Sequence, residues 1–236
     1  QYELAERISR NRKDEKVKIA YFSGTKTHDK DFLEAAEALS QILRQYENIE
    51  LHIVGDLDLP EELGKFGNRI VRKQFVPYLE MLEYLSRMDI NIAPLEQNNP
   101  YTEGKSELKI FEAGAVAVPT VASRVDSYSR CISDGKNGFL AGSKEEWVEK
   151  LSLLIANEEI RTKIGMNARN DFLNTFYIGN AIEDVMKVYE EILQAYRQKN
   201  IDLNHIDIAW IIPEPFVGSG GHRNIFRAVK KLSEYG

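Results

Sequence analysis

The sequence predicts an α/β fold: a Rossmann-like parallel sheet flanked by helices, with a strand–loop–helix extension at its carboxyl end. Short apolar runs, typical of buried parallel strands, alternate with stretches whose apolar residues recur every three or four positions. Such alternation favours parallel strands joined by right-handed helical crossovers. Near residue 206 the pattern starts again with an apolar run, a glycine-rich turn and an amphipathic stretch. This restart predicts the extension.

The first hundred residues contain four predicted strands and two predicted helices. The strands are residues 17–22, 50–55, 69–75 and 89–94. Asp31 opens a helix whose apolar residues follow the 3.6-residue period, and residues 78–86 form a second helix with Leu79, Leu82 and Leu85 facing inward. The order of these elements is that of a Rossmann-like half.

The next part of the chain continues the alternation and then ends in helices. Ser106 is the predicted cap of a helix whose Leu108, Ile110 and Phe111 face inward, and residues 119–122 and 138–140 are strands. The run Ser143-Lys144-Glu145-Glu146 is a capping box that opens another helix. Two further helices cover residues 158–174 and 180–197.

The domain boundary is predicted near residue 199. Residues 1–199 form one domain, and 200–236 form a linker and a single strand–loop–helix unit, which is too short to complete a second Rossmann domain. We therefore expect the chain to be cut from a longer protein. In the alternative interpretation the unit adds an edge strand and a helix to the main sheet.

The composition limits the possible partners. The formal net charge is −6 and the isoelectric point is about 5.4, which argues against a nucleic acid, because neutralising its phosphates needs a basic surface. A single cysteine, Cys131, allows no internal disulfide. No apolar run approaches the roughly 18 residues that suggest a membrane span. We expect no transmembrane segment and a cytoplasmic protein, with peripheral binding at the inner membrane face left open.

Two groups of polar residues lie where parallel sheets bind ligands, at the carboxyl ends of strands. Lys109 and Glu112 are three residues apart and share one helix face. Residues 23–31 form a loop that leads into a helix, with Gly24, Lys26 and Lys30 able to receive a phosphate near free N–H groups and a positive dipole end. The plainer alternatives are a solvated Lys–Glu pair and solvated loop lysines.

The segment around Glu112 resembles a family signature. Glu112-Ala113 followed by Val118-Pro119 resembles the second half of the E-x7-E signature of retaining two-domain (GT-B) glycosyltransferases. The resemblance implies that Glu112 holds the ribose hydroxyls of a nucleotide sugar. The first Glu of the signature falls at Gly104, where this chain departs from the pattern, and the neighbouring Glu103 can substitute.

The same resemblance implies contacts from further residues. Lys105, Ser106, Lys109 and Glu112 match a Lys-Ser-x-x-Lys-x-x-Glu variant of the family, which implies that Ser106 lies in the donor site. The resemblance also implies that Glu103, Lys105 and Lys109 contact the sugar or the phosphates. Lys30 falls at the position of a diphosphate-binding lysine.

Other matches of the resemblance are looser. Thr25 replaces the arginine of the family, with Lys26 beside it, and Val76 matches a loop that contacts the nucleobase. The turn containing Gly220, Gly221 and His222 resembles the opening loop of a GT-B amino-terminal domain.

The resemblance therefore implies a donor-binding carboxyl-terminal domain of a glycosyltransferase. Such enzymes move a sugar from a nucleotide diphosphate to an acceptor hydroxyl with retention, and the acceptor here would be a glycan or a lipid-linked group. No metal and no cofactor are expected, and no catalytic residue is identified. Since the amino-terminal GT-B domain is missing, we expect binding without turnover by this chain alone.

Two alternatives remain open at this stage. A nucleotide-sugar 2-epimerase shares the GT-B fold and the ribose-binding Glu. A degenerate, non-catalytic nucleotide-binding or assembly domain is the second, because Gly104 and Thr25 depart from the family pattern.

Overall fold

The computed structural model describes residues 16–24, 28–97, 99, 102, 105–176, 182 and 186–194. The chain divides into two units, residues 1–182 and 183–236. The first unit contains the sheet, and in the second the described residues 186–194 are helical. The predicted extension, with Gly220, Gly221 and His222, lies outside the described residues.

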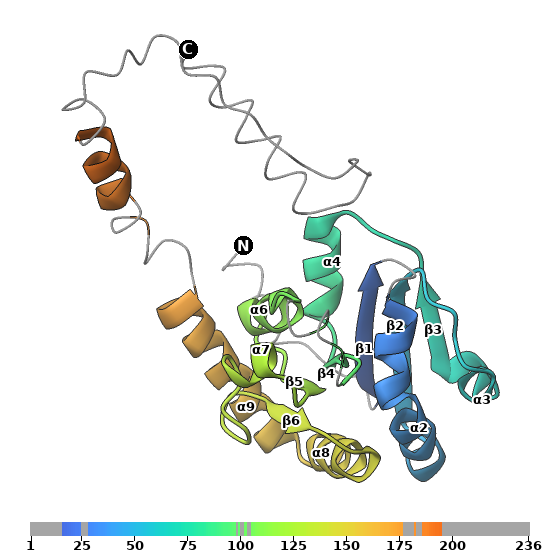
Figure 1. Cartoon of the computed structure of the whole chain (residues 1–236). Helices are drawn as coiled ribbons and strands as arrows, with labels where there is room; N and C mark the ends of the chain where they lie inside the picture. The colour runs from blue at the N-terminus through green and yellow to red at the C-terminus, as the bar shows by residue number, and fades with distance from the viewer. Residues whose placement is uncertain are drawn as a thin grey trace. The chain divides into compact units, whose positions relative to one another are not determined.

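The first unit is built on a six-stranded parallel sheet (Figure 1). Its strands, in chain order, are β1 (Val17–Gly24), β2 (Ile49–Gly55), β3 (Ile70–Lys73), β4 (Ile90–Ala93), β5 (Thr120–Ser123) and β6 (Phe139–Ala141). They lie in the order β3-β2-β1-β4-β5-β6, and every neighbouring pair is parallel. The order reverses between β1 and β4, so the topological switch point of this sheet lies there. In open parallel sheets, ligands bind beyond the carboxyl ends of the strands at such a point.

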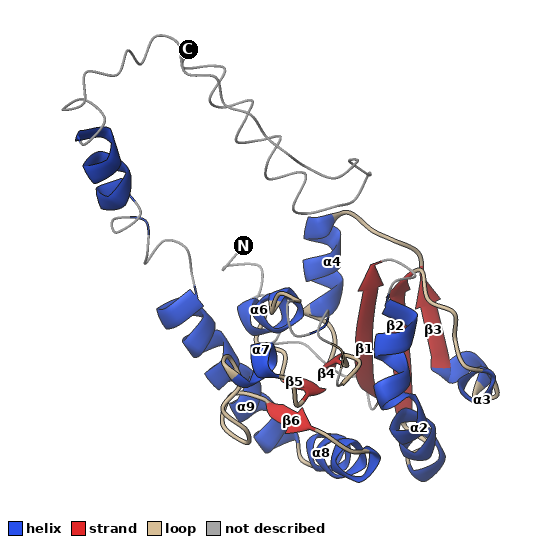
Figure 2. Ribbon diagram, viewed as in Figure 1, coloured by secondary structure: helices blue, strands red, loops and turns tan. Residues whose placement is uncertain are grey.

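Helices cover both faces of the sheet (Figure 2). They are α2 (Asp29–Gln45), α3 (Glu61–Gly64), α4 (Tyr78–Leu85), α6 (Leu108–Ala115), α7 (Asp126–Ser129), α8 (Lys144–Ala156) and α9 (Glu158–Asp171), with a short 3-10 helix at Gly67–Arg69 and a π-helical turn at Phe172–Phe176. Helices α2 and α8 pack against each other, as do α4 and α6, and α6 also packs on α9. None of the described helices is long and apolar enough to cross a membrane.

The alternation of side chains along β1 assigns the two faces. Tyr21 is fully buried in one cluster with Phe32 of α2 and Trp147 of α8. The neighbouring Ala20 points the other way and is buried in a second cluster with Leu85 of α4. This period of two is what a strand covered on both sides requires. Burying each large apolar side chain contributes about 1.5–3 kcal/mol, so the two clusters hold the layers together.

The strands and long helices predicted between residues 17 and 174 are confirmed to within a few residues, but the start of α6 differs from the prediction. The helix begins at Leu108, its N-cap is Glu107, and no side chain caps it, so Ser106 is not the cap. Leu108 is exposed rather than inward, because the buried positions of α6 are Ile110, Ala113 and Gly114.

Helix α4 also differs in one inward position. Leu79 is 62% exposed, whereas Leu85, at the other end of the helix, is buried. In Figure 1 the first turn of α4 stands beyond the arrowhead of β1. The apolar period alone did not distinguish the exposed Leu79 from the buried Leu85.

Candidate functional site

Some of the residues predicted to bind a ligand, Lys105 and Lys109, lie at the switch point between β1 and β4. The loop after β1 contributes His28, and the segment after β4 contributes Lys105 and the helix α6. Helix α6 carries Lys109 and Glu112 one turn apart. The topology therefore brings the Lys109 side chain to the main-chain oxygen of Phe22, 87 positions earlier in the chain.

Lys109 is a half-buried cation at the carboxyl end of β1. Its Nζ donates a hydrogen bond of 2.6 Å to the main-chain oxygen of Phe22 and lies 5.4 Å from the centre of the Tyr21 ring. Burial lowers the pKa of Lys109 to about 8, while the charges of Glu112 and Asp31 oppose this shift. Among the described residues no carboxylate forms an ion pair with Lys109. In the part of the chain that the structure describes, the ammonium group of Lys109 therefore contacts a carbonyl oxygen and no carboxylate. This leaves the ammonium group able to bind an anion.

Glu112 is a half-buried acid on the same face of α6. Burial raises its pKa to about 7, and the charge of Lys109 opposes the shift. The pKa of Tyr78, at the start of α4, is raised by burial and by the charge of Glu112, which places these two side chains near each other. Neither Lys109 nor Glu112 is exposed, so a solvated surface pair does not describe them. A carboxylate in this position can accept two hydroxyl hydrogen bonds.

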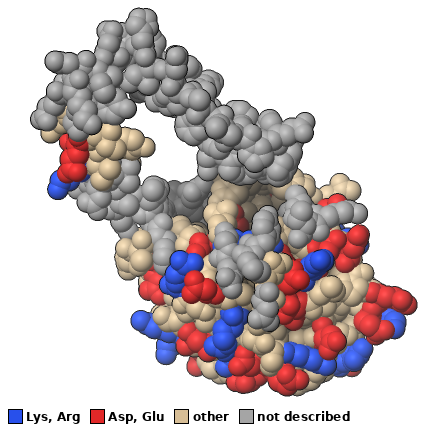
Figure 3. Space-filling view, viewed as in Figure 1, with Lys and Arg blue, Asp and Glu red and all other residues tan. Residues whose placement is uncertain are grey.

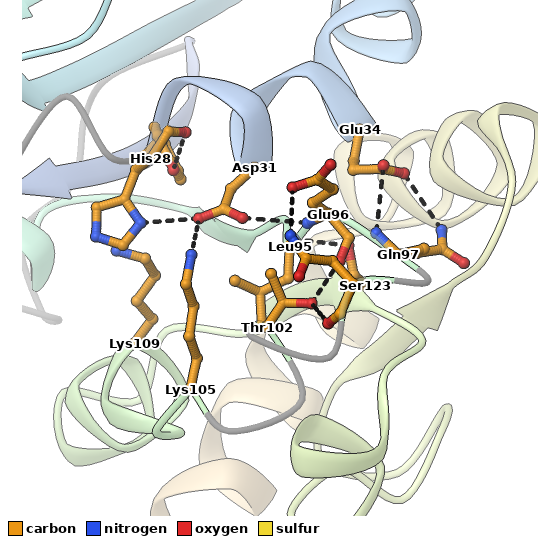
Figure 4. A network of polar contacts seen from close by, with 12 residues as sticks. His28, Asp31, Glu34, Leu95, Glu96, Gln97, Thr102, Lys105, Lys109 and Ser123 are labelled. Carbon is orange, nitrogen blue, oxygen red and sulfur yellow. Dashed lines mark hydrogen bonds and ion pairs between the residues drawn. The ribbon is translucent and has the colours of Figure 1, made fainter.

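A third polar group is centred on Asp31, near the start of α2 (Figure 4). Its Oδ2 accepts from Lys105 Nζ at 2.5 Å and from His28 Nδ1 at 2.9 Å, and its Oδ1 accepts from the backbone N–H of Glu96 at 3.1 Å. The Asp31 side chain is 2% exposed, and that of Lys105 is 19% exposed. Burial alone would raise the pKa of Asp31, but the hydrogen bonds from His28 and Lys105 hold it below its ordinary value. Asp31 is therefore a buried carboxylate.

The segment after β4 is tied down by several side chains. The backbone N–H of Leu95 donates to Ser123 Oγ at 2.8 Å, and Thr102 Oγ1 donates to the oxygen of Glu96 at 2.7 Å. Gln97 Nε2 donates to the oxygen of Gly142 at 3.2 Å. Figure 4 shows the Leu95–Ser123 and Thr102–Glu96 contacts beside the Asp31 group. Leu95 and Gln97 are therefore bonded to the last residue of β5 and to the residue that follows β6, and Thr102 is bonded back to Glu96.

The remaining predicted residues lie at different distances from this group. Lys30 is exposed in the first turn of α2, and Val76 is half-buried in the loop before α4. Gly24 ends β1 and pairs with Gly55 of β2, and Ser106 is exposed just before α6. Lys26 and Glu103 lie outside the described residues.

Asp31 and its partner His28 are not among the site residues that the sequence predicts. The sequence predicts that Asp31 opens a helix, whereas α2 begins at Asp29 and Asp31 faces the interior beside Phe32. The signal was available in the spacing, because His28 and Asp31 are three residues apart at a helix start. Asp29 instead accepts from the backbone N–H of Asp58 at 3.2 Å.

The surface charge is mixed on the face drawn in Figure 3. Acidic and basic side chains of the described residues are interspersed there. Among those residues this face carries no continuous basic area of the kind that nucleic-acid binding needs.

Comparison with known proteins places the chain among glycosyltransferases. The sequence profile described as "Glycosyl transferases group 1" matches residues 16–157. The capsular polysaccharide biosynthesis glycosyltransferase CapM of Staphylococcus aureus is 22% identical over 182 residues, which are 73% of this chain and 46% of CapM. The chain spans less than half the length of the curated relatives it matches.

Solved structures with the same fold include two informative neighbours. Anabaena HepE, crystallised with UDP, has a TM-score of 0.65 at 17% identity, covering 81% of this chain and 55% of HepE. The carboxyl-terminal domain of LpcC from Francisella tularensis has a TM-score of 0.53 at 19% identity, covering 68% of this chain and 86% of that domain. At these identities the likeness shows the fold alone, which is that of GT-B glycosyltransferases. The profile, by contrast, covers more than half of the chain, and it shows that this protein belongs to the glycosyl transferases group 1 family.

Proposed function

We propose that this chain is the donor-binding domain of a retaining GT-B glycosyltransferase, and that it binds a nucleotide-diphosphate sugar at the β1–β4 switch point. The observation that carries the proposal is the pair on α6: a half-buried ammonium, Lys109, one turn from a half-buried carboxyl, Glu112. The ammonium group would bind a diphosphate, and the carboxylate would accept hydrogen bonds from a ribose diol. Support also comes from HepE, a GT-B neighbour whose structure holds UDP.

The charge of Lys109 suits the leaving diphosphate. Stabilising the charge that develops on a leaving group is often the largest single contribution to catalysis, and it is strongest in a site from which water is excluded. Lys109 is positioned by its bond to Phe22 before any ligand arrives. The conformational entropy of the Lys109 side chain is therefore lost during folding and not during ligand binding.

The sugar would be transferred to an acceptor hydroxyl of a glycan or a lipid-linked group. CapM supports a polysaccharide, since its name assigns it to capsular polysaccharide biosynthesis. The acceptor would bind in the amino-terminal GT-B domain, and the chain spans 55% of HepE. We therefore expect nucleotide binding, and no acceptor-dependent transfer, from this chain alone, in the cytoplasm or at the inner face of a membrane.

Calorimetry with UDP, GDP and dTDP tests the proposal. The full chain should bind at least one of them, with the same affinity in EDTA as with Mg²⁺, because no metal is proposed. Glu112→Ala and Lys109→Met should each weaken that binding at least tenfold, which is about 1.4 kcal/mol. Binding of none of the three nucleotides would overturn the proposal and favour a degenerate domain.

A matched control lies on α8. Glu149 and Lys150 are neighbouring opposite charges, and Lys150 Nζ pairs with Glu149 at 3.1 Å. Glu149→Ala removes a negative charge and Lys150→Met removes a positive charge, as the two test variants do, but on α8. Their nucleotide affinity should match that of the unmodified chain, and an equal loss in both pairs of variants would show that the effect is not local.

A further inference from the structure

Asp31 joins the two chain segments that flank the topological switch point. His28 belongs to the segment after β1, whereas Glu96 and Lys105 belong to the segment after β4, and all three donate to this one carboxylate. A side chain that only opened a helix would not need partners from both segments. The placement points to a role in arranging the ends of β1 and β4 relative to each other.

The Asp31 carboxylate also reduces the positive charge that Lys105 presents to a bound anion. Transferring a carboxylate from water into the protein interior is costly unless it is paired and hydrogen-bonded. Lys105 supplies that pairing at 2.5 Å, with both side chains largely buried. Much of the charge of Lys105 is thus compensated by Asp31, in contrast to Lys109, whose contact partner is a carbonyl. An anion at this point therefore needs a donor besides Lys109.

His28 can be that donor because Asp31 fixes its orientation. His28 Nδ1 donates to the Asp31 carboxylate at 2.9 Å, so Nδ1 carries the proton and Nε2 is the second ring nitrogen. Among the described residues no hydrogen bond to Nε2 is formed. The His28 side chain is 24% exposed, so a ligand can reach it. In Figure 4 the side chain of Lys109 extends toward His28, and that of Lys105 toward Asp31.

We propose that Asp31 is a positioning residue of the donor site, which holds His28 so that Nε2, once protonated, donates to the donor diphosphate beside Lys109. This inference rests on the proposed function and adds His28 to its binding residues. The proton on Nε2 comes from solvent as the anion binds, and the Asp31 carboxylate stabilises the resulting imidazolium. No covalent step is involved.

The charged groups around His28 are consistent with this arrangement. On α2 the ring contacts Asp31, and the main-chain oxygen of His28 accepts from the Tyr21 hydroxyl of β1 at 3.4 Å. From α6 and the segment before it come Lys109 and Lys105. Asp31 pairs with Lys105, and the charge of Glu112 acts on Lys109, so two ammonium groups and an imidazole gather where an anion would bind.

Nitrogen-15 NMR of the histidine rings in the full chain tests the proposal. The probe is inorganic diphosphate in EDTA, which carries no base and no sugar. The chain has four histidines, and His28→Gln assigns the His28 signals by their loss. We expect the free chain to show a protonated Nδ1, and diphosphate to shift the Nε2 signal to that of a protonated nitrogen. In Asp31→Asn the free tautomer should be mixed and the shift should be lost.

Affinity for inorganic diphosphate gives a second readout. His28→Gln and Asp31→Asn should each raise the dissociation constant about five- to tenfold, and the double variant should lose little more, because the two residues act as one unit. Asp89→Asn is the matched control. Asp89 is a largely buried acid that accepts a backbone N–H, from Lys18 at 2.8 Å, at the opposite end of the strands, and its loss should leave diphosphate affinity unchanged.

The outcomes separate this inference from the function on which it rests. If diphosphate binds and Lys109→Met abolishes binding, but the His28 signals do not move, the inference is wrong and the proposed function stands. If neither diphosphate nor any nucleotide binds, both are wrong. Should Asp31→Asn fail to fold, the ring signals of the unmodified chain and the affinity of His28→Gln still decide the matter.

Discussion

The Nζ of Lys109 lies 2.6 Å from the main-chain oxygen of Phe22, and this hydrogen bond joins helix α6 to the carboxyl-terminal end of β1. This bond fixes an ammonium group at the end of the strand where the sheet order reverses. Glu112 follows one turn later, and burial shifts the pKa values of the two groups toward each other, to about 8 and about 7. Both groups are charged together only in a narrow interval of pH.

Nucleotide binding should therefore be strongest between about pH 7 and pH 8. Below pH 7 Glu112 gains a proton and no longer accepts two ribose hydroxyls. Above pH 8 Lys109 loses its charge and its attraction for the diphosphate. On each side the affinity should fall by up to about tenfold per pH unit. Calorimetric titration with UDP, or with whichever nucleotide binds, at half-unit steps from pH 5.5 to pH 9.5 measures the profile.

Single substitutions identify which residue causes the loss of nucleotide affinity at low pH and which causes it at high pH. Lys109→Arg keeps its charge at high pH, so the decline above pH 8 should disappear. Glu112→Gln cannot titrate, so its weaker binding should no longer depend on a protein group near pH 7. A profile that is unchanged in both variants would show that other groups control the binding.

Glu112→Gln should make the ligand-free protein more stable. Burial raises the pKa of Glu112 from 4.5 to about 7, so the folded state favours the protonated form and ionisation costs stability. That cost is absent below pH 4.5, grows as the pH rises through 7, and is complete at pH 8. The variant should gain on the order of 1–2 kcal/mol at pH 8, because a shift of one unit corresponds to about 1.4 kcal/mol and solvent screens part of it.

Urea unfolding at pH 8 and pH 5 measures this gain. The difference between the variant and the unmodified chain should shrink at pH 5, where both carry a neutral group. A gain in stability together with a loss of nucleotide affinity would assign Glu112 to binding rather than to the fold. Loss of stability in the variant at pH 8 would show that Glu112 contributes to the fold instead.

Much of the fold could be predicted from the sequence because the strands are buried on both faces. Short apolar runs such as the one ending at Ala122 have few alternatives in a chain where helices alternate with them. The switch point between β1 and β4 follows from the order of a Rossmann-like half. The pairing of Lys109 and Glu112 on one helix face followed from their spacing, and the structure places Lys109 at that point with Glu112 one turn further along α6.

The Asp31 group could not be predicted in the same way, because it depends on contacts between distant segments. Asp31 and Lys105 are 74 positions apart, and only the parallel pairing of β1 with β4 brings their segments together. Local rules also failed at the start of α6. Ser106 has the right chemistry for a cap, but the helix starts two residues after it, with Glu107 between them. Caps depend on backbone angles that the residue type does not determine.

Two serines that look alike in the sequence should therefore differ in their effect on stability. Ser143 accepts a hydrogen bond from the backbone N–H of Glu146 at 3.3 Å and caps α8. Ser143→Ala should cost about 1 kcal/mol in the free energy of unfolding. Ser106→Ala should change it by less than about 0.5 kcal/mol, because that exposed side chain caps nothing. Parallel urea unfolding of both variants makes the comparison, and equal losses would contradict it.

Gly165 of α9 should be the most sensitive glycine among those described. A Cβ added there would lie 2.2 Å from the main-chain oxygen of Ala117, in the turn that connects α6 to β5. That turn is itself constrained, since Ala117 has a φ of 59°, so the oxygen cannot easily retreat. Gly165→Ala should destabilise the fold by about 2–3 kcal/mol, and because α6 carries Lys109 and Glu112, it should also weaken nucleotide binding.

Gly64→Ala, on α3, is the control, since no atom lies within 4 Å of the added Cβ and the change should be nearly neutral. Calorimetric melting of the two variants distinguishes them, and a Gly165→Ala protein as stable as Gly64→Ala would mean that α9 can move away from the turn without cost.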